Sequence, residues 1–435
     1  MSAVAESTAA FSAAASRELG EGTNDTPAIA ALRSEAVALS SKKAWPDSRK
    51  ERPWKYHNIA TLDLGRYTPG MSASNGAAAG VRSCPVTGEH AAAIVLENSD
   101  VIFSEASPDG LDLIAFSALI DGRLQKLVDE RLGSAVAAGT SKLTALHYAF
   151  LAGGVLVATA PNSEFKEPVR IVRNYSGGGQ FAAPHTLIVT GANSRVHVVE
   201  ECRSDEGDIV VMPAVEVLPG PGSVVRHTVV HRWGTNTKVY TEQRMVSERD
   251  SEFVSLQIVA GGGVVKGHLE SSLVARGSSS ELYGVTLGTG NQHADFFTTQ
   301  DHVGPDTRSD LLFKSALRGH ARSVYYGMTR VGLGARNADA NQENRNLLLS
   351  DTARADSDPV LEILTSDVIR VSHGATAGPV DEEQLYYLQT RGIPYEAAEA
   401  LLVRAFAGQV LDRVADEALR DELSAVLDAR WDSPE

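Results

Sequence analysis

The sequence has very little cysteine. Among its 435 residues there are only two, Cys84 and Cys202, and they lie far apart along the chain. Two isolated thiols form neither a disulfide framework nor a CxxC metal site, so a disulfide-stabilised secreted domain is excluded and a reducing compartment is expected. We predict that Cys202, which follows a strand, is buried and that Cys84, in a Gly- and Pro-rich stretch, is exposed.

Long apolar runs and excess positive charge are also missing. No apolar run reaches 18 residues, so no membrane-spanning helix is expected. The N-terminus lacks a basic segment followed by an apolar one, which argues against a secretory signal and predicts a cytoplasmic protein. The formal net charge of −15 repels phosphate backbones, so general nucleic-acid binding is not expected.

The common catalytic motifs are absent as well. There is no Walker phosphate loop, no GxGxxG that opens a helix, no HExxH and no GxSxG. The glycine run 261–263 lies between strands and indicates a turn. His227 and His231 are four residues apart, so they share a face on either a helix or a strand. In a strand they lie about 13 Å apart along it, which disfavours a metal pair but leaves it as the minor alternative.

Three compositional zones follow one another. Residues 1–150 are predicted to be mainly helical with loops, including helices over 27–41 and 112–132 and a loop over 68–90. Residues 151–378 alternate Val-, Ile-, Leu- and Thr-rich runs with Gly, Ser, Asn and Asp, which is typical of strands and turns.

The last zone, residues 379–435, is predicted to be helical. Asp381 is a suitable N-cap for a helix over 382–391, and Gly392 is a suitable stop. Further helices are expected over 395–410 and 415–431, with Pro394 at the start of the first of them. From residue 380 onward the tail carries 13 acidic and 5 basic side chains, which indicates either a solvated helical surface or a docking site for a basic partner.

The middle zone repeats at an almost constant interval. A turn signal followed by Ser or Asn recurs every 28 or 29 residues, and an apolar residue follows most of these markers by two positions. A fixed period of this size indicates stacked supersecondary units, and each unit is too short for a 10-residue helix. We therefore predict a β-helix with two or three short strands per coil; a β-sandwich is the alternative, but it requires no constant period. The markers are Ser194, Ser223, Ser251, Ser280, Ser309 and Asn337, and the apolar residues are Val196, Val225, Phe253, Leu282 and Leu311.

His373 lies where the strand zone meets the helical tail. The small residues around it, in the segment Val371–Thr376, allow a second chain to approach closely. This histidine is a candidate metal ligand completed from across an interface, and a purely structural histidine is the alternative.

Two long segments give the chain a resemblance to a known family. They read NQENRNLLLSDTARADSDPVLEI over Asn341–Ile363 and VSHGATAGPVDEEQLYYLQTRGI over Val371–Ile393, and a short PWKY motif stands at Pro53–Tyr56. These segments resemble the SufB/SufD family of iron–sulfur cluster assembly scaffolds, and the chain length and short N-terminal zone are most similar to SufD.

The resemblance implies a mainly β protein, with a right-handed parallel β-helix core flanked by N-terminal and C-terminal α-helical regions. It implies a non-enzymatic scaffold that pairs with SufB through the β-helix and binds the ATPase SufC through its C-terminal helices. It further implies that a transient iron–sulfur cluster forms at the SufB–SufD interface with His373 as a ligand, and that the isolated chain holds no cofactor tightly. Family members often have cysteine at the position of Val371, so this chain lacks that thiol.

The resemblance also suggests the partner-binding residues. Tyr386, Tyr387 and Phe406 are candidates for the apolar centre of the SufC-docking surface, although some of these aromatics are expected to pack internally against the β-helix. Two other functions are considered: a β-helix enzyme acting on polysaccharide, and a SufB-like homodimeric scaffold. The repeat units show no aligned carboxylate pair, which argues against the enzyme. The absence of cysteine at Val371 argues against the homodimeric scaffold. Monomer and homodimer both remain open for the isolated chain.

Overall fold

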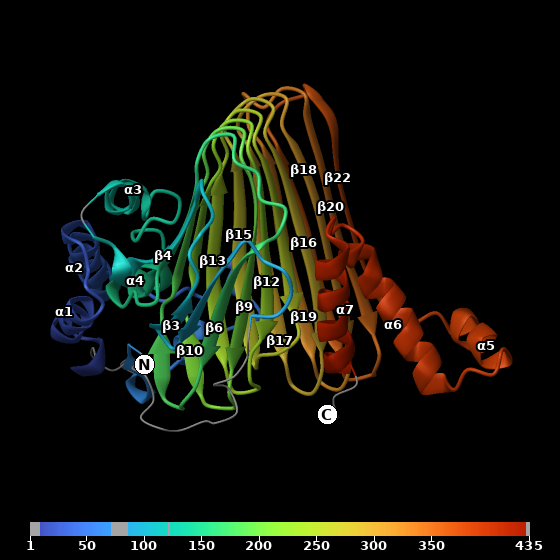
Figure 1. Ribbon diagram of the computed structural model, residues 1–435. Helices are drawn as coiled ribbons and strands as arrows, with labels where there is room; N and C mark the ends of the chain where they lie inside the picture. Colours follow the sequence, from blue (N-terminus) through green and yellow to red (C-terminus); the bar gives the residue numbers. More distant parts are fainter. Residues whose placement is uncertain (1–8, 71–85, 121, 432–435) are drawn as a thin grey trace.

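The computed structural model describes residues 9–70, 86–120 and 122–431, and its core is a parallel β-helix (Figure 1). Two sheets face each other along the whole core. In spatial order, the 12-stranded sheet A contains β21 (Arg354–Ile363), β19 (Arg322–Val331), β17 (His293–His302), β15 (Val264–Leu273), β13 (Lys238–Val246), β11 (Ala214–Leu218), β8 (His185–Val189), β5 (Val155–Thr159) and β4 (Leu111–Ala115), with β1 (Thr68–Pro69), β7 (Gln180–Ala182) and β10 (Ile209–Val211) beside this path.

The second sheet, sheet B, has ten strands. In spatial order they are β22 (Val368–Gly378), β20 (Ala338–Leu348), β18 (Arg308–Leu317), β16 (Ser279–Gly288), β14 (Glu252–Val259), β12 (Val224–Arg232), β9 (Arg195–Ser204), β6 (Val169–Tyr175), β2 (Ala92–Glu97) and β3 (Asp100–Ser104). From β8 onward the chain passes from one sheet to the other and back, and from β12 onward each coil adds one strand of 8–11 residues to each sheet. This confirms the β-helix and corrects the expectation of short strands.

A recurring turn explains the repeat in the sequence. From β8 to β20, each passage from sheet A to sheet B contains one residue with a left-handed backbone shortly before the sheet B strand. Asn, Asp and Gly occupy these positions because they tolerate positive φ. Three of the markers directly follow their turn residues, whereas Ser280 and Ser309 lie two positions farther along the chain. A shift of two keeps side chains on the same face of a strand. All five predicted core residues are accordingly buried. The turn residues are Asn193, Gly222, Asp250, Gly277, Asp306 and Asn337.

The N-terminal region is less helical than predicted. The helix expected over 27–41 is confirmed as α2 (Pro27–Lys42), which follows α1 (Ala13–Gly22). The helix expected over 112–132 is wrong in its first half: this stretch forms β4, which buries alternate side chains and pairs antiparallel with β5. A short 3-10 helix over Phe116–Ala118 follows β4, α3 (Arg123–Arg131) is the α-helix among the described residues of this stretch, and α4 (Lys142–Ala149) comes next.

Strands β2, β3 and β4 extend both sheets upstream of residue 151. Strand β2 already pairs in parallel with β6, as in every later coil. Most of the loop expected over 68–90, including Cys84, lies outside the described residues.

The two helical regions cover the outer faces of the two sheets. The N-terminal helices pack on outward residues of sheet A such as Leu187, Met212 and Tyr240. The predicted C-terminal helices are confirmed as α5 (Glu382–Thr390), α6 (Tyr395–Leu411) and α7 (Glu417–Trp431). Helices α6 and α7 pack on outward residues of sheet B, whereas α5 projects away from both sheets (Figure 1).

The caps of the C-terminal helices follow the sequence closely. The Asp381 side chain accepts hydrogen bonds from the backbone N–H groups of Glu383 and Gln384, and Gly392 has a φ of 86° directly after the helix end. Pro394 is the N-cap of α6 rather than its first residue.

Candidate functional site: the terminal coil and the C-terminal arm

The β-helix ends on two edge strands, β21 in sheet A and β22 in sheet B. Each pairs with the preceding strand of its sheet, β19 and β20, and is the last strand in the order of that sheet. The backbone N–H and C=O groups on their far sides are therefore available to another chain. Pro359 lies within β21, and proline is tolerated in strands mainly at such edges because it has no N–H to donate.

His373 lies on the edge strand β22 and its side chain is exposed. Its cross-strand partner in β20 is Gln342, which is fully buried between the two sheets. Residues opposite one another in a parallel pair share a face, so His373 occupies an inward position of the last coil. It is exposed because the described chain adds no further coil over it. Val371 and Ala375 flank it on the same face, which leaves the imidazole among small side chains.

The interior of this last coil is polar, whereas the preceding coils enclose apolar side chains together with polar ones. The inward side chains of β20 include Gln342, Asn344 and Asn346, all nearly inaccessible to solvent. Asn346 donates to Asn344 Oδ1 at 2.7 Å and to the carbonyl of Thr376 at 3.1 Å, and Ser357 of β21 bonds to Asn344. These amides tie the two edge strands to the body of the helix. The break in the apolar pattern after Asn337 thus marks the point where the mixed apolar and polar interior gives way to amide side chains.

No cysteine on a described strand lies near His373. Cys202 is buried, as predicted, and sits on β9, six strands away from β22 in the same sheet. With strands about 4.8 Å apart, this separation is about 29 Å. Burial also raises the pKa of the Cys202 thiol well above its ordinary value, which keeps it protonated. Cys202 and His373 therefore cannot bind one metal centre together.

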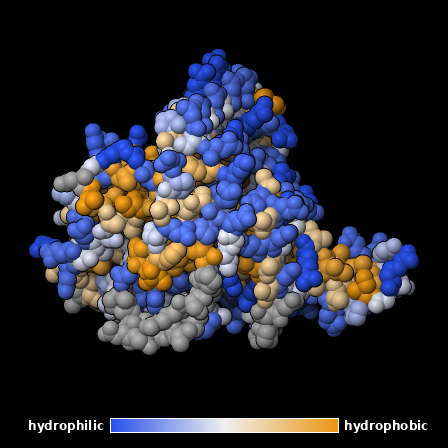
Figure 2. Space-filling model, in the orientation of Figure 1, coloured by the Kyte–Doolittle hydropathy of each residue, from blue (hydrophilic) through white to orange (hydrophobic). Residues whose placement is uncertain are grey.

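The C-terminal arm, which we define as α5 and the first half of α6, is exposed. Tyr386 and Tyr387 of α5 are 70% and 57% exposed, and Leu401 of α6 is 44% exposed. The arm is held to the body by a small cluster in which Leu385 and Ala398 are buried. Figure 2 shows hydrophobic residues gathered on this projecting part of the molecule. An exposed apolar surface of this kind is typical of a protein-binding site.

Phe406 does not belong to that exposed surface. It lies farther along α6, where the helix packs on β18, and the Lys314 ammonium is 4.2 Å from the centre of its ring. Lys314 also donates to the backbone carbonyl of Phe406 at 3.0 Å. Burial lowers the pKa of Lys314 to about 8. Phe406 therefore has a different environment from Tyr386 and Tyr387. Its contact with Lys314 anchors the arm to sheet B, whereas the two tyrosines are exposed.

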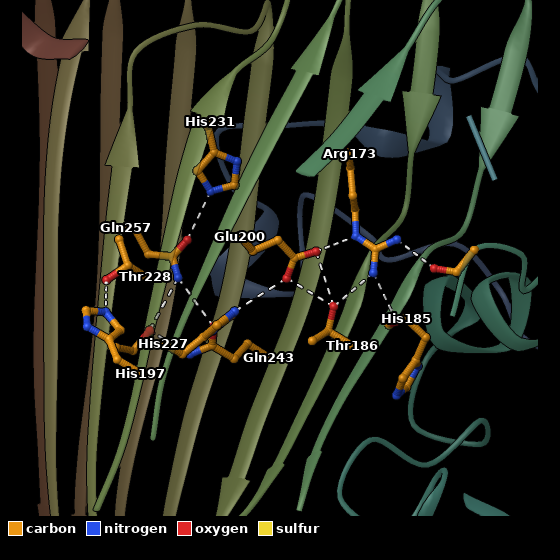
Figure 3. Close-up of polar contacts among 12 residues, drawn as sticks. Arg173, His185, Thr186, His197, Glu200, His227, Thr228, His231, Gln243 and Gln257 are labelled. Carbon is orange, nitrogen blue, oxygen red and sulfur yellow. Dashed lines mark hydrogen bonds and ion pairs between the residues drawn. The ribbon is translucent and has the colours of Figure 1, made fainter. Parts of the chain in front are cut away.

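The sequence analysis missed a polar network inside the β-helix (Figure 3). Arg173 of β6 and Glu200 of β9 are both buried, and Arg173 Nε donates to Glu200 Oε1 at 2.5 Å. Thr186 Oγ1 donates to the same carboxylate at 3.0 Å, and His227 Nε2 lies 3.4 Å from it. The signal was available, because Glu200 follows Val196 and Val198 at the inward positions of a strand.

This network keeps Glu200 ionised. Burial by itself raises the pKa of the carboxyl group, but the Arg173 guanidinium and the His227 hydrogen bond outweigh it and hold the pKa at about 2. The remaining Arg173 nitrogens donate to the carbonyls of Gly153 and His185. The pair is therefore neutral overall and well hydrogen-bonded, as a buried ion pair must be.

His231 lies in the same interior and uses both ring nitrogens. Trp233 Nε1 can only donate, and it lies 3.0 Å from His231 Nδ1, so Nε2 carries the proton and donates to Gln257 at 3.0 Å. Burial lowers the pKa of His231 to about 4. A metal pair with His227 is excluded by these bonds. Within the described parts of the chain, no group of three His, Cys, Asp or Glu side chains is arranged to hold a metal ion.

Comparison with known proteins agrees with this architecture. Residues 172–406 match the family model described as SUF system FeS cluster assembly, SufBD core domain. The chain is 30% identical over 342 residues to the iron-sulfur cluster assembly protein SufD of Bacillus subtilis, with 77% of this chain and 75% of that protein covered. It is 29% identical over 307 residues to an iron-sulfur cluster assembly SufBD family protein of Mycobacterium tuberculosis, with 69% and 76% covered.

None of the described helices is both long enough and apolar enough to cross a membrane. The family model covers more than half of the chain, and it spans the β-helix from β6 through the terminal coil and into α6. The chain therefore belongs to the SufBD family of iron–sulfur cluster assembly proteins and is SufD-like.

Proposed function

We propose that this chain is a non-catalytic scaffold subunit that pairs with SufB through its terminal coil and binds the ATPase SufC through its C-terminal arm. A nascent iron–sulfur cluster would form at the SufB–SufD interface, shared between the chains and not held tightly by this chain alone. The cytoplasm is the expected location. The observation that carries the proposal is that His373 stands exposed on an edge strand at an inward position that no described residue covers.

The chemistry of the terminal coil supports a shared site. Iron–sulfur clusters are held mainly by thiolates, with histidine as an occasional ligand. Val371 replaces the cysteine of many relatives, and Cys202 is about 29 Å away by strand spacing. Since the described residues place no thiol beside His373, the thiolate of the shared site is proposed to come from the partner. The unpaired edges of β21 and β22 suit continuation of both sheets into that partner, because backbone hydrogen bonds fix the register of such an addition.

The arm suits a different kind of contact. Tyr386 and Tyr387 are exposed next to the acidic residues Glu382 and Glu383 on α5. Tyrosines supply large contact area at low entropic cost, and the surrounding carboxylates would steer a basic partner. Phe406 would contribute indirectly by fixing the orientation of α6 against sheet B.

The first test is co-expression of the chain with SufB and SufC of the same organism, followed by affinity purification and anaerobic reconstitution with iron and sulfide. We expect a three-component complex, and we expect His373→Ala to reduce the cluster absorbance while the complex still assembles. His320→Ala, which removes an exposed histidine from a turn, is the matched control. Equal reconstitution by both variants would remove His373 from the site. Failure to form any complex would contradict the scaffold function.

A second test separates the two surfaces. The double variant Tyr386→Ala/Tyr387→Ala is expected to lose SufC and to keep SufB. Ile120→Ala, which removes a side chain that is 83% exposed in the N-terminal region, is the control and should keep both partners. Loss of SufB instead of SufC would show that the arm is assigned to the wrong partner. Size-exclusion chromatography with light scattering of the isolated chain would show whether the same edges form a homodimer.

A further inference from the structure

A pocket lies between sheet B and the turn that joins α6 to α7. Its volume is about 390 Å³, within the usual range for small-ligand sites. Outward side chains of β9, β12, β14 and β16 form one wall, the turn residues 410–416 form the other, and the segment 164–166 closes a third side. The terminal coil and the projecting arm do not contribute to it, so the proposed scaffold function leaves it unexplained.

The floor of the pocket is apolar. Val254 and Leu256 of β14 face Val410 and Val414 across it, and the ring of Tyr283 stands beside them. Two polar side chains meet at the same wall, where His197 Nε2 and Thr228 Oγ1 lie 2.9 Å apart. Burial lowers the pKa of His197 to about 3, so this imidazole is neutral and acts as a hydrogen-bonding group. A flat apolar body with polar edges fits such a surface.

The rim of the pocket is rich in cations, although the chain as a whole carries a net charge of −15. Two of the rim cations, Lys166 and Arg195, have no carboxylate within 4 Å among the residues that the structure describes. Arg226 lies 3.6 Å from Glu252, and Arg413 is held over the ring of Tyr283 at 5.5 Å. The cations that line the pocket are Lys166, Arg195, Arg226 and Arg413.

Two carboxylates also line the pocket, Glu164 and Asp416. Asp416 accepts a hydrogen bond from the backbone N–H of Leu419 at 3.1 Å at the start of α7, so its charge is already used to cap that helix. Among the lining side chains four cations thus stand against two carboxylates.

Three further carboxylates contact lining residues without lining the pocket: Glu252 lies beside Arg226, and Glu281 and Asp310 accept from the Tyr283 hydroxyl. The positive charge available to a ligand is therefore mainly that of Lys166 and Arg195, above an apolar floor. Guanidinium groups present paired N–H donors that match the oxygens of a phosphate.

We propose that this pocket binds a small phosphorylated aromatic ligand of the nucleotide type. The flat ring would lie on the apolar floor near Tyr283, and the phosphate would contact Arg195 and Arg226 from the sheet and Arg413 from the helix turn. Because the two walls belong to different elements, the bound ligand would also hold the α6–α7 turn against sheet B. This ligand site is independent of the proposed scaffold function, and its experimental test does not involve SufB or SufC.

The test is calorimetric titration of the full chain with AMP, and with adenosine and inorganic phosphate as the two halves of that probe. We expect saturable binding of AMP at one site, weaker binding of each half, and an affinity that falls as the salt concentration rises. Arg195→Gln and Arg226→Gln should each weaken AMP binding about tenfold or more, since each removes a charged hydrogen-bond donor. Arg249→Gln removes an exposed arginine outside the pocket and should have no effect.

Hydrogen exchange supplies a second measurement that needs no variant. AMP should slow exchange in residues 410–416, and adenosine should slow it less. Absence of saturable AMP binding up to the millimolar range would overturn the proposal. Equal affinity for AMP and adenosine, or equal losses in Arg226→Gln and Arg249→Gln, would also overturn it, because the phosphate would then not be recognised by the rim.

Discussion

The early coils and the terminal coil have the same backbone plan, but their interiors differ in how completely they are enclosed and in which polar groups they hold. Around β6, β9 and β12 the inward side chains are large and tightly enclosed, and they include the ion pair of Arg173 and Glu200 (Figure 3). In the terminal coil the inward residues are amides, small side chains and His373, and the last strands are open to solvent. The two ends of the same axis therefore differ: the early coils enclose their interior completely, and the last coil leaves β21 and β22 at the edges of the described sheets.

The two interiors differ because buried charges and buried amides have different energetic requirements. A charge enclosed in an early coil must be paired permanently, because the low dielectric makes an unpaired charge very unfavourable. The amides of β20 bond to each other and to β21 and β22, and they remain compatible with water or with another polar chain at the open end. Four predictions test this contrast, in order of decreasing expected effect on stability.

Breaking the buried ion pair should have the largest effect. Glu200→Leu leaves the Arg173 guanidinium without its carboxylate, and we expect the free energy of unfolding to fall by about 3–5 kcal/mol in urea denaturation. Combining it with Arg173→Met should recover much of that loss, because no buried charge remains. A loss below about 1 kcal/mol in the single variant would show that the interior admits water around Arg173.

A second buried carboxylate joins the N-terminal helices to sheet A. Glu216 accepts hydrogen bonds from the backbone N–H groups of Gly133, Ala135 and Val136 at 2.6–2.8 Å. Burial raises the pKa of this carboxyl group, but the His185 imidazole 3.2 Å away and the backbone hydrogen bonds outweigh it and hold the pKa below its ordinary value.

Glu216→Gln should lower the free energy of unfolding by about 2 kcal/mol. The charge-assisted hydrogen bonds from the backbone become neutral ones, and the new side-chain NH2 group points at a backbone N–H group, which is itself a donor. Faster proteolysis between α3 and α4 would accompany the loss, and limited digestion with mass spectrometry measures it. Glu248→Gln, in an exposed turn, is the control. Equal stability of both variants would contradict a structural role for Glu216.

Acid should destabilise the early coils. The pKa of His231 in the folded chain is about 4, whereas an unfolded histidine has a value near 6.5. Between these values the unfolded chain binds more protons, so the free energy of unfolding falls as the pH decreases from 6.5 to 4, by at most about 1.4 kcal/mol per pH unit for each such group. Burial acts in the same direction on His147, whose pKa is about 3.

The urea midpoint measured between pH 8 and pH 4.5 checks this slope. His231→Gln keeps an acceptor for Trp233 and should make the pH dependence shallower, whereas His320→Gln at an exposed turn should not change it. An unchanged slope in His231→Gln would mean that other groups cause the acid sensitivity.

The smallest effect on stability is expected at the terminal coil. His373→Ala removes an exposed side chain from an edge strand, so the free energy of unfolding should change by no more than about 0.5 kcal/mol. Thermal unfolding of the isolated variant measures this. A large loss of stability would show that His373 is structural, and any loss of cluster assembly in the variant would then need a different explanation.

Much of the architecture was predictable because local chemistry repeats. One left-handed turn residue per coil, followed by inward apolar residues such as Val196 and Val225, leaves a period that can be counted along the chain. The caps at Asp381 and Gly392 fix a helix for the same local reason. The first half of the stretch 112–132 was predicted wrongly. Its apolar spacing is typical of a helix, but in the folded chain these residues pair with β5 and form the strand β4.

The candidate site was predictable only in part. The position of His373 in the chain was identified on the sequence, but its inward register opposite Gln342 and its exposure on the last strand depend on where the coils stop. Phe406 and the two tyrosines looked equivalent on the sequence, and only the packing of α6 on Lys314 separates them. The pairing of Arg173 with Glu200 joins residues of neighbouring coils, which a single strand pattern does not connect.

The sequence by itself thus determined the family, the repeat, the helical tail and the isolated histidine, since each is recorded in short segments or at a constant spacing. The tertiary structure alone decided which charges meet inside the β-helix, which face of each helix is covered, and which strands remain unpaired. These properties arise from contacts between residues that are distant in the chain, and their energies depend on burial, which no local pattern specifies.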